Sequence, residues 1–202
     1  MWKLVLAAML VPGLAAARPT VAARAAFAPA IGGAAEHLSM DEAIGMQLPL
    51  QLDALWREGR LAAGAYASLA LGRVSVAACT DGAECSGSAF RLGAQATWAL
   101  PPPRGWPAPW IGGGLGWEWI SWSRDRLGSE TARGFAGPEA FLQGGAEWSL
   151  GARVALGPYA LLAIGRYARA SVETPVASAS SDVGERAFHA WIHLGVRCRV
   201  DL

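Results

Sequence analysis

The sequence predicts an all-β fold, an eight-stranded antiparallel transmembrane β-barrel. Two observations lead to this prediction. Residues 188–202 alternate between a set that is apolar or small and a set that is mostly polar or charged, and a period of two is typical of a strand with two unlike faces. The pattern recurs along the chain without helices or a second apolar layer to cover the apolar faces. We therefore expect the apolar faces to meet lipid and the polar faces to line the interior.

Eight segments carry this alternation. A weaker first strand lies somewhere within residues 21–35. The others are expected at 42–57, 60–78, 88–100, 110–124, 134–149, 153–173 and 185–202. Short turns at 58–59, 101–107 and 150–151 alternate with longer polar connections at 37–41, 80–87, 125–133 and 174–184. An even strand number, with short periplasmic turns and longer exterior loops, is typical of bacterial barrels.

Two strands contain irregular positions. In the seventh, Arg166 and Tyr167 break the alternation, which predicts a bulge. In the second, Pro49 lacks a backbone donor and predicts either a bulge or weakened pairing.

The apolar face of three strands can be assigned residue by residue. The outward sets of the second, fourth and sixth strands are Ile44, Met46, Leu48, Leu50 and Leu52; Phe90, Leu92, Ala94, Ala96 and Trp98; and Ala140, Leu142, Ala146 and Trp148. The apolar sets of the second, fourth and eighth strands contain no charged residue. Such a bare surface is rare on soluble monomers, which argues against a soluble, lipocalin-like barrel of reversed polarity.

The opposite faces supply a polar interior. The expected lumen network comprises Asp53, Arg91, Glu118, Glu139, Glu147, His189, His193, Arg197 and Arg199. An eight-stranded barrel is just wide enough for side chains to fill it, and charges inside must pair or stay hydrated. These properties favour a plugged lumen, with a narrow conductive path as the alternative.

Tryptophan placement supports a membrane setting, because indole rings favour the membrane interface. The chain has 10 tryptophans. The expected aromatic girdle comprises Trp56, Trp98, Trp106, Trp110 and Trp148 near the short turns, and Trp117, Trp119 and Trp122 towards the opposite end.

The N-terminal segment has the pattern of a secretory signal peptide. Lys3 supplies a charge, residues 4–14 are apolar, and residues 15–17 form an A-x-A-like cleavage site; a short buried helix is the alternative. We expect residues 1–17 to be removed and residues 18–202 to form the barrel domain. No later apolar run approaches the ~20 residues that a spanning helix needs. Export combined with lipid-facing strands predicts the outer membrane of a Gram-negative-type cell, with outer-membrane lipid as a partner.

The chain has 3 cysteines. Cys79 and Cys85 bracket a short polar stretch, so a disulfide is expected in an oxidising compartment. A metal pair is the alternative, but histidines are not nearby. Cys198 lies on the apolar face of the last strand and is expected to act as a small hydrophobic residue. We expect no metal and no cofactor.

By this architecture the chain resembles the small eight-stranded outer-membrane barrels, such as OmpX, OmpW and the membrane domain of OmpA. The resemblance covers essentially the whole chain after residue 17 and implies insertion by the barrel assembly machinery. Members of this family commonly end in an aromatic residue that the machinery reads. Here the last strand keeps the alternation through Val196, Cys198 and Val200 but ends in Leu202.

The sequence favours a structural or interaction role through exterior loops, with an extracellular ligand left open. A narrow channel or a conduit for small hydrophobic molecules is the second hypothesis. A lipid A or phospholipid hydrolase or acyltransferase is the third, because no catalytic residues stand out: Ser68, Ser121 and Ser123 are not within two residues of either His189 or His193. The spacing of these histidines suits zinc on a helix face rather than on a strand. With 17 basic and 16 acidic residues and no basic stripe, nucleic acid is not expected as a partner.

Overall fold

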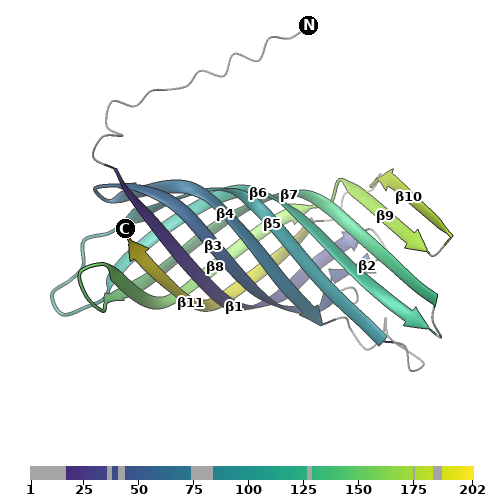
Figure 1. Ribbon diagram of the computed structural model, residues 1–202, viewed down its shortest axis with the longest axis horizontal. Helices are drawn as coiled ribbons and strands as arrows, with labels where there is room; N and C mark the ends of the chain where they lie inside the picture. Colours follow the sequence, from purple (N-terminus) through teal and green to yellow (C-terminus); the bar gives the residue numbers. More distant parts are fainter. Residues whose placement is uncertain are drawn as a thin grey trace, which may run out of the picture.

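The computed structural model describes residues 17–35, 38–40, 44–73, 84–126, 129–174, 176–183 and 188–202. Within these ranges the chain forms a closed antiparallel barrel of eight strands, as predicted (Figure 1). Its wall consists of β1 (Arg18–Ala35), β3 (Met46–Glu58), β4 (Leu61–Arg73), β5 (Glu84–Ala99), β6 (Ala108–Arg126), β7 (Ser129–Ser149), β8 (Val154–Arg166) and β11 (Phe188–Asp201).

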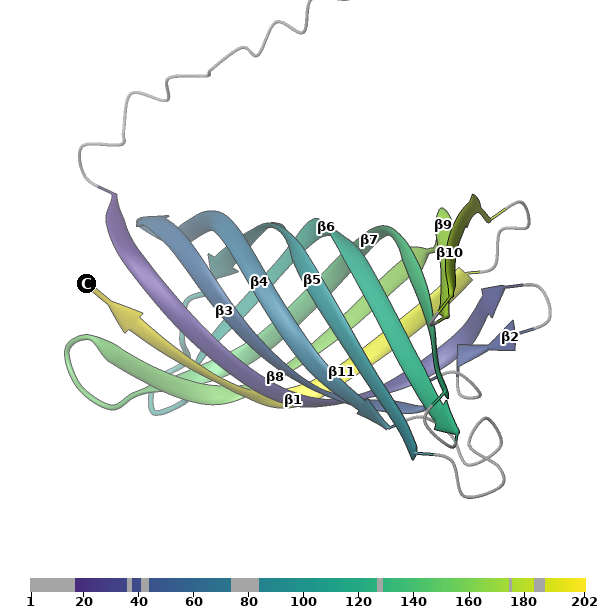
Figure 2. The same ribbon diagram turned by 45° about the vertical axis from the view of Figure 1, so that its right-hand side comes forward.

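Each wall strand pairs with its neighbours in the chain, and β1 pairs with β11 to close the ring. The strands wrap obliquely around the barrel (Figure 2). One end, here called the turn end, carries the connections 59–60, 100–107 and 150–153, together with the start of β1 and the C-terminus (Figure 1). The opposite end, here called the loop end, carries the remaining connections. Short β2 (Leu38–Ser39) pairs with β1 there.

Pro49 weakens pairing without causing a bulge. The β3–β4 register runs unbroken through the Pro49–Ala70 pair. On the other side of β3, Ala25 pairs with Leu50 and Ala28 pairs with Gln47. Both pairs belong to the same register, but the two positions between them on each strand are not paired. The missing N–H of proline therefore interrupts the ladder only towards β1.

The bulge predicted at Arg166 and Tyr167 is confirmed. β7 pairs with β8 as far as Glu139–Gly165 and with β9 from Ala136–Arg169, so two residues of β7 face the three residues 166–168. β8 ends at Arg166, and β9 (Arg169–Thr174) starts after two residues and pairs with β7. β9 then pairs with β10 (Ala177–Asp182) to form a hairpin at the loop end (Figures 1 and 2). Tyr167, at the break, turns into the barrel and is 1% exposed. Across the bulge the side-chain alternation shifts by one residue, so that Tyr167 faces inward and Arg169 faces outward.

All four predicted exterior loops are wrong in part. β2 lies within the connection expected at 37–41, and β5 begins at Glu84 within the connection expected at 80–87. Across the connection expected at 125–133, β6 and β7 continue as a ladder to the pair Arg126–Ser129. The connection expected at 174–184 contains β10, all of whose residues are exposed. Neither of the last two segments has an apolar face to bury, so no alternation marked them as strands.

The face assignments are confirmed for β3, β5 and β7, apart from Ile44. Outward residues such as Leu50 and Leu142 are 64% and 73% exposed, whereas their inward neighbours are buried. Ile44 lies before β3 and is fully buried. A Cβ placed on Gly72 would come 2.4 Å from Ile44 Cγ2, so Ile44 packs over the inner wall instead of facing out.

In the described part of the chain, we find no helix of the length and apolar character required to cross a membrane.

Candidate functional site

The interior holds two clusters of charged side chains. The first, the turn-end cluster, is centred on Arg24 of β1 and Asp53 of β3, whose side chains are both 0% exposed. Arg24 Nη2 lies 2.6 Å from Asp53 Oδ2, and Arg24 Nε donates to the same oxygen at 2.8 Å. Gln51 Nε2 donates to Asp53 Oδ1 at 2.8 Å. The carboxylate is thereby paired on both oxygens.

Arg24 also reaches the far wall. Its Nη2 donates to Gln95 Oε1 of β5 at 2.9 Å, and its Nη1 donates to Gln143 Oε1 of β7. Gln143 Nε2 in turn donates to Gln95 at 2.9 Å. One guanidinium therefore joins β1, β3, β5 and β7 across the lumen. Arg24 was not among the expected lumen residues, although it shares the inward set with Ala22, Ala26 and Ala28.

From this centre, ion pairs continue to the turn end. Arg197 Nη1 donates to Glu147 Oε1 at 2.7 Å, and Arg199 Nε donates to Glu147 Oε2 at 2.9 Å. Arg199 also pairs with Asp201, which accepts from Thr20 Oγ1 at 3.0 Å. Exposure rises along this chain from buried Arg197 to half-buried Asp201.

The second cluster, the loop-end cluster, surrounds Glu118 of β6. Arg91 Nη2 donates to its Oε1 at 2.5 Å. Its Oε2 lies 2.8 Å from His189 Nε2 and accepts from Tyr167 Oη at 3.0 Å. The rings of Tyr167 and His189 stack at 4.1 Å. Glu118 is therefore held from β5, β11 and the residue at the β8 break.

Glu139 of β7 completes this cluster. Arg91 Nε lies 3.4 Å from Glu139 Oε2, and Tyr66 Oη donates to Glu139 Oε1 at 3.0 Å. Arg91 also donates to Gln47 Oε1 at 3.2 Å. The structure thus places every residue of the expected lumen network inside the barrel. His193, also buried, has no hydrogen bond from either ring nitrogen to a described residue.

Tryptophan and tyrosine rings fill the space between the charges. The guanidinium of Arg197 lies 4.5 Å from the Trp110 ring centre, and that of Arg91 lies 5.3 Å from the Trp191 ring centre. Such stacking of cations on aromatic faces is favourable where water is excluded. Arg24 lies in the same way 5.4 Å from Tyr159.

The expected girdle is wrong for Trp110 and Trp122. They are 4% and 9% exposed, and Trp122 stacks on Phe135 inside the barrel at 5.5 Å. Both lie an even number of residues from inward-facing Glu118, so strand alternation turns them inward whatever their distance from a turn. Of the other expected members, Trp56, Trp98, Trp106, Trp119 and Trp148 are exposed and Trp117 is half-buried.

No protein-family model matches the chain, and no curated protein matches its sequence significantly. Solved structures do match. Neisserial surface protein A is similar with a TM-score of 0.55 and 16% identity, covering 91% of this chain and 97% of that one. A major outer membrane protein from Thermus thermophilus is similar with a TM-score of 0.52 and 15% identity, covering 89% of this chain and 99% of that one.

The chain has the fold of a small outer-membrane β-barrel. In the described part of this barrel, the interior holds paired charges. His189 binds Glu118, and no described hydrogen bond joins a serine to a histidine. Among the residues that the structure describes, no three histidine, cysteine, aspartate or glutamate side chains are grouped so as to hold a metal ion.

Two expectations for this barrel stay predictions. Residues 1–16 of the expected signal peptide lie outside the described residues. Cys79 does too, so the Cys79–Cys85 disulfide is not tested. Cys198 is a free cysteine, half-buried on the outward set of β11.

Proposed function

We propose that this protein is an outer-membrane barrel whose interior is closed by its own side chains, and that its role is structural or interactive through the loop end. The observation that carries the closed interior is the Arg24 side chain. It crosses the lumen to Gln95 and Gln143 while it and Asp53 remain fully buried.

The outer wall supports a membrane location. On β5 the outward residues from Trp98 to Phe90 are apolar, and the segment spans eight residue steps. At ~3.3 Å per residue and a tilt of ~40°, this stretch covers roughly 20 Å along the barrel axis, close to the ~25 Å band of membrane barrels. Phe90 and Trp119 lie at the loop-end limit of this band, and their ring centres are 5.6 Å apart.

Serine residues follow immediately towards the loop end. Ser88 and Ser121 are hydrogen-bonded at 3.2 Å, and Ser86 and Ser123 at 3.0 Å. The change from aromatic to hydroxyl side chains between two successive outward rows fits the boundary of a bilayer. At the other end of the band, exposed Trp56, Trp98 and Trp148 fit the second boundary.

Within this proposal, residues 1–17 direct export, the barrel assembly machinery inserts the chain, and the loop end faces outward from the cell. Proteolysis of intact cells tests the orientation. Exposed Arg133 and Arg169 lie at the loop end, whereas exposed Arg60, Arg104 and Arg153 lie at the turn end. Trypsin added outside should cut only after loop-end arginines. Cleavage at Arg104 in intact cells would contradict this orientation and indicate that the turn end faces outward.

Electrical recording in a planar bilayer tests the closed interior. The reconstituted protein, shown to be folded by its mobility shift on heating in SDS, should give no conductance steps. Arg24→Ser removes the side chain that crosses the lumen and should introduce small steps, whereas Arg104→Ser in the exposed turn should not. Steady conductance from the unmodified protein would contradict the closed interior and favour the narrow-channel hypothesis. A protein without a heat shift, found in the soluble periplasmic fraction, would overturn the membrane proposal.

A further inference from the structure

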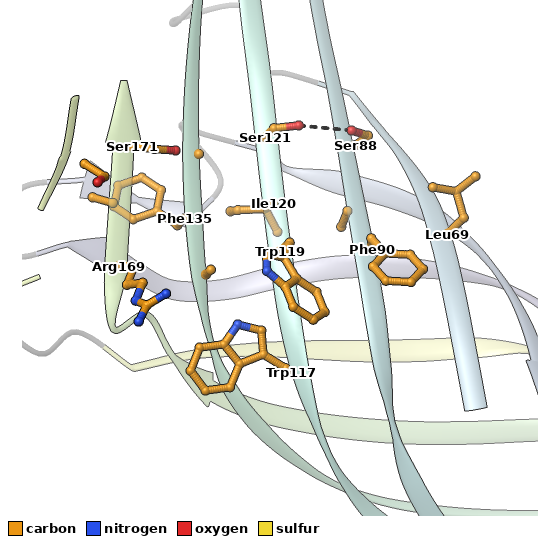
Figure 3. Close-up of a pocket in the computed structure, with 15 residues that line it drawn as sticks. Leu69, Ser88, Phe90, Trp117, Trp119, Ile120, Ser121, Phe135, Arg169 and Ser171 are labelled. Atoms are coloured by element: carbon orange, nitrogen blue, oxygen red, sulfur yellow. Dashed lines mark hydrogen bonds between the residues drawn. The ribbon is translucent and has the colours of Figure 1, made fainter. Parts of the chain in front are cut away.

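A trough lies on the outer wall near the loop end, where β5, β6, β7 and β9 run side by side (Figure 3). Its volume is about 600 Å³, within the ~300–1,000 Å³ of typical ligand pockets. We call it the outer-wall trough. Aromatic side chains lie towards its turn end and serines towards its loop end, and Arg169 of β9 lies in the same row as Trp119.

Strand register explains its shape. In one row across the wall, Phe90 pairs with Trp119, Trp119 with Ala136, and Ala136 with Arg169. In the next row towards the loop end, Ser121 pairs with Gly134 and Gly134 with Ser171. The outward residues of β7 are thus small, while those of the strands on both sides are larger. The trough follows β7 because its Ala136 and Gly134 leave the space unfilled.

The trough differs chemically from the rest of the wall. Two other grooves, of about 500 Å³ over Trp98 and Leu142 and about 480 Å³ over Leu50 and Leu69, have only apolar exposed lining. The outer-wall trough adds exposed Arg169, Ser121 and Ser171 to an apolar surface. It therefore offers a cation and hydroxyl donors beside aromatic rings.

Arg169 is available for a ligand. It forms no ion pair with any residue in the described ranges. The nearest acid by register is Asp182, opposite it on β10, and no ion pair joins the two.

We propose that the outer-wall trough binds an anionic, phosphate-bearing lipid of the surrounding leaflet. The inference rests on the membrane location proposed above. The acyl chain lies along Phe90 and Trp119, and the phosphate meets Arg169 and the hydroxyls of Ser121 and Ser171. The depth is appropriate, because the trough straddles the row where the wall changes from aromatic to serine side chains. A basic side chain at this depth attracts anionic lipid.

Contact quenching by brominated lipids tests this proposal. The full chain is folded into phosphatidylcholine vesicles that contain an equal fraction of either brominated phosphatidylglycerol or brominated phosphatidylcholine. Comparison with a Trp117→Phe/Trp119→Phe variant isolates the fluorescence that arises at the trough. We expect the anionic quencher to be preferred there by roughly fivefold, the factor that one basic residue near the surface supplies.

Three variants make the test specific. Arg169→Gln should abolish the preference, and Asp182→Asn should raise it by removing the acid opposite Arg169. Arg104→Gln, in the exposed turn at the other end, should leave it unchanged. Equal quenching by both lipids, or a preference that survives Arg169→Gln, in a protein that still shows the heat shift would overturn the lipid site alone. A protein that does not enter vesicles would overturn both the site and the proposed membrane location.

Discussion

Removing Arg24 should destabilise the barrel more than removing any exposed arginine. In Arg24→Met, Asp53 would remain buried with Gln51 at 2.8 Å and with Arg197 Nε only at 4.0 Å. Breaking a buried ion pair by deleting one partner costs about 3–5 kcal/mol, because the remaining charge is uncompensated. Gln143 Oε1 would also lose its donor, which costs about 1–3 kcal/mol if the oxygen stays dry. We expect a total loss in the free energy of unfolding of about 4–8 kcal/mol.

A double variant separates charge from packing. In Arg24→Met/Asp53→Leu both charges leave together, and replacing a buried ion pair by apolar residues of similar volume is often neutral. The double variant should therefore recover at least half of the loss. Arg104→Met, at an exposed position, should change stability by no more than about 0.5 kcal/mol.

The measurement is urea unfolding of the protein folded in vesicles, followed by tryptophan fluorescence and by the fraction that stays compact in unheated SDS. The shift of the midpoint, at an unchanged slope, gives the change in stability. A loss below about 1 kcal/mol for Arg24→Met, with no recovery in the double variant, would refute the reasoning. It would mean that water reaches Asp53, and the lumen would then be hydrated rather than closed.

Three further predictions concern the wall and the cysteines. Leu92→Arg, at a position 48% exposed on the outer face, should cost about 2–4 kcal/mol in a bilayer and reduce the heat-modifiable fraction, whereas Leu92→Phe should not; equal folding of both would argue against a lipid-facing wall. Gly137→Ala should destabilise by about 1–3 kcal/mol, because a Cβ there would lie 2.0 Å from the Arg166 carbonyl oxygen, whereas Gly151→Ala, with nothing within 4 Å, is the neutral control in the same urea assay. Thiol counting in denaturant without reductant should find one reactive cysteine of the 3 in the chain, from Cys198; three would exclude the Cys79–Cys85 disulfide.

Strand identity and the facing of side chains could be predicted from sequence because both are local properties. Successive Cβ atoms point to opposite faces of any strand, so Phe90 and Leu92 had to share one face and Arg91 and Gln95 the other. The same rule predicts that Trp110 faces inward with Glu118. The girdle assignment instead relied on the distance of Trp110 from a turn, and it was wrong for that reason. The β10 strand was missed for the opposite reason: its small polar residues are exposed on both faces and carry no alternation.

Only the tertiary structure decided which interior groups meet. Arg24 and Gln143 are 119 residues apart in sequence, and their contact depends on the stagger of strands around the ring. Register also decides three other contacts. Gln95 accepts a hydrogen bond from Arg24, and Tyr167 reaches Glu118 from the break after β8. Ala136 and Gly134 lie between Trp119 and Arg169. The sequence by itself determined the polarity of each face, since a two-residue period needs no partner. Closure of the barrel determined the pairing, because it brings together side chains that no local pattern relates.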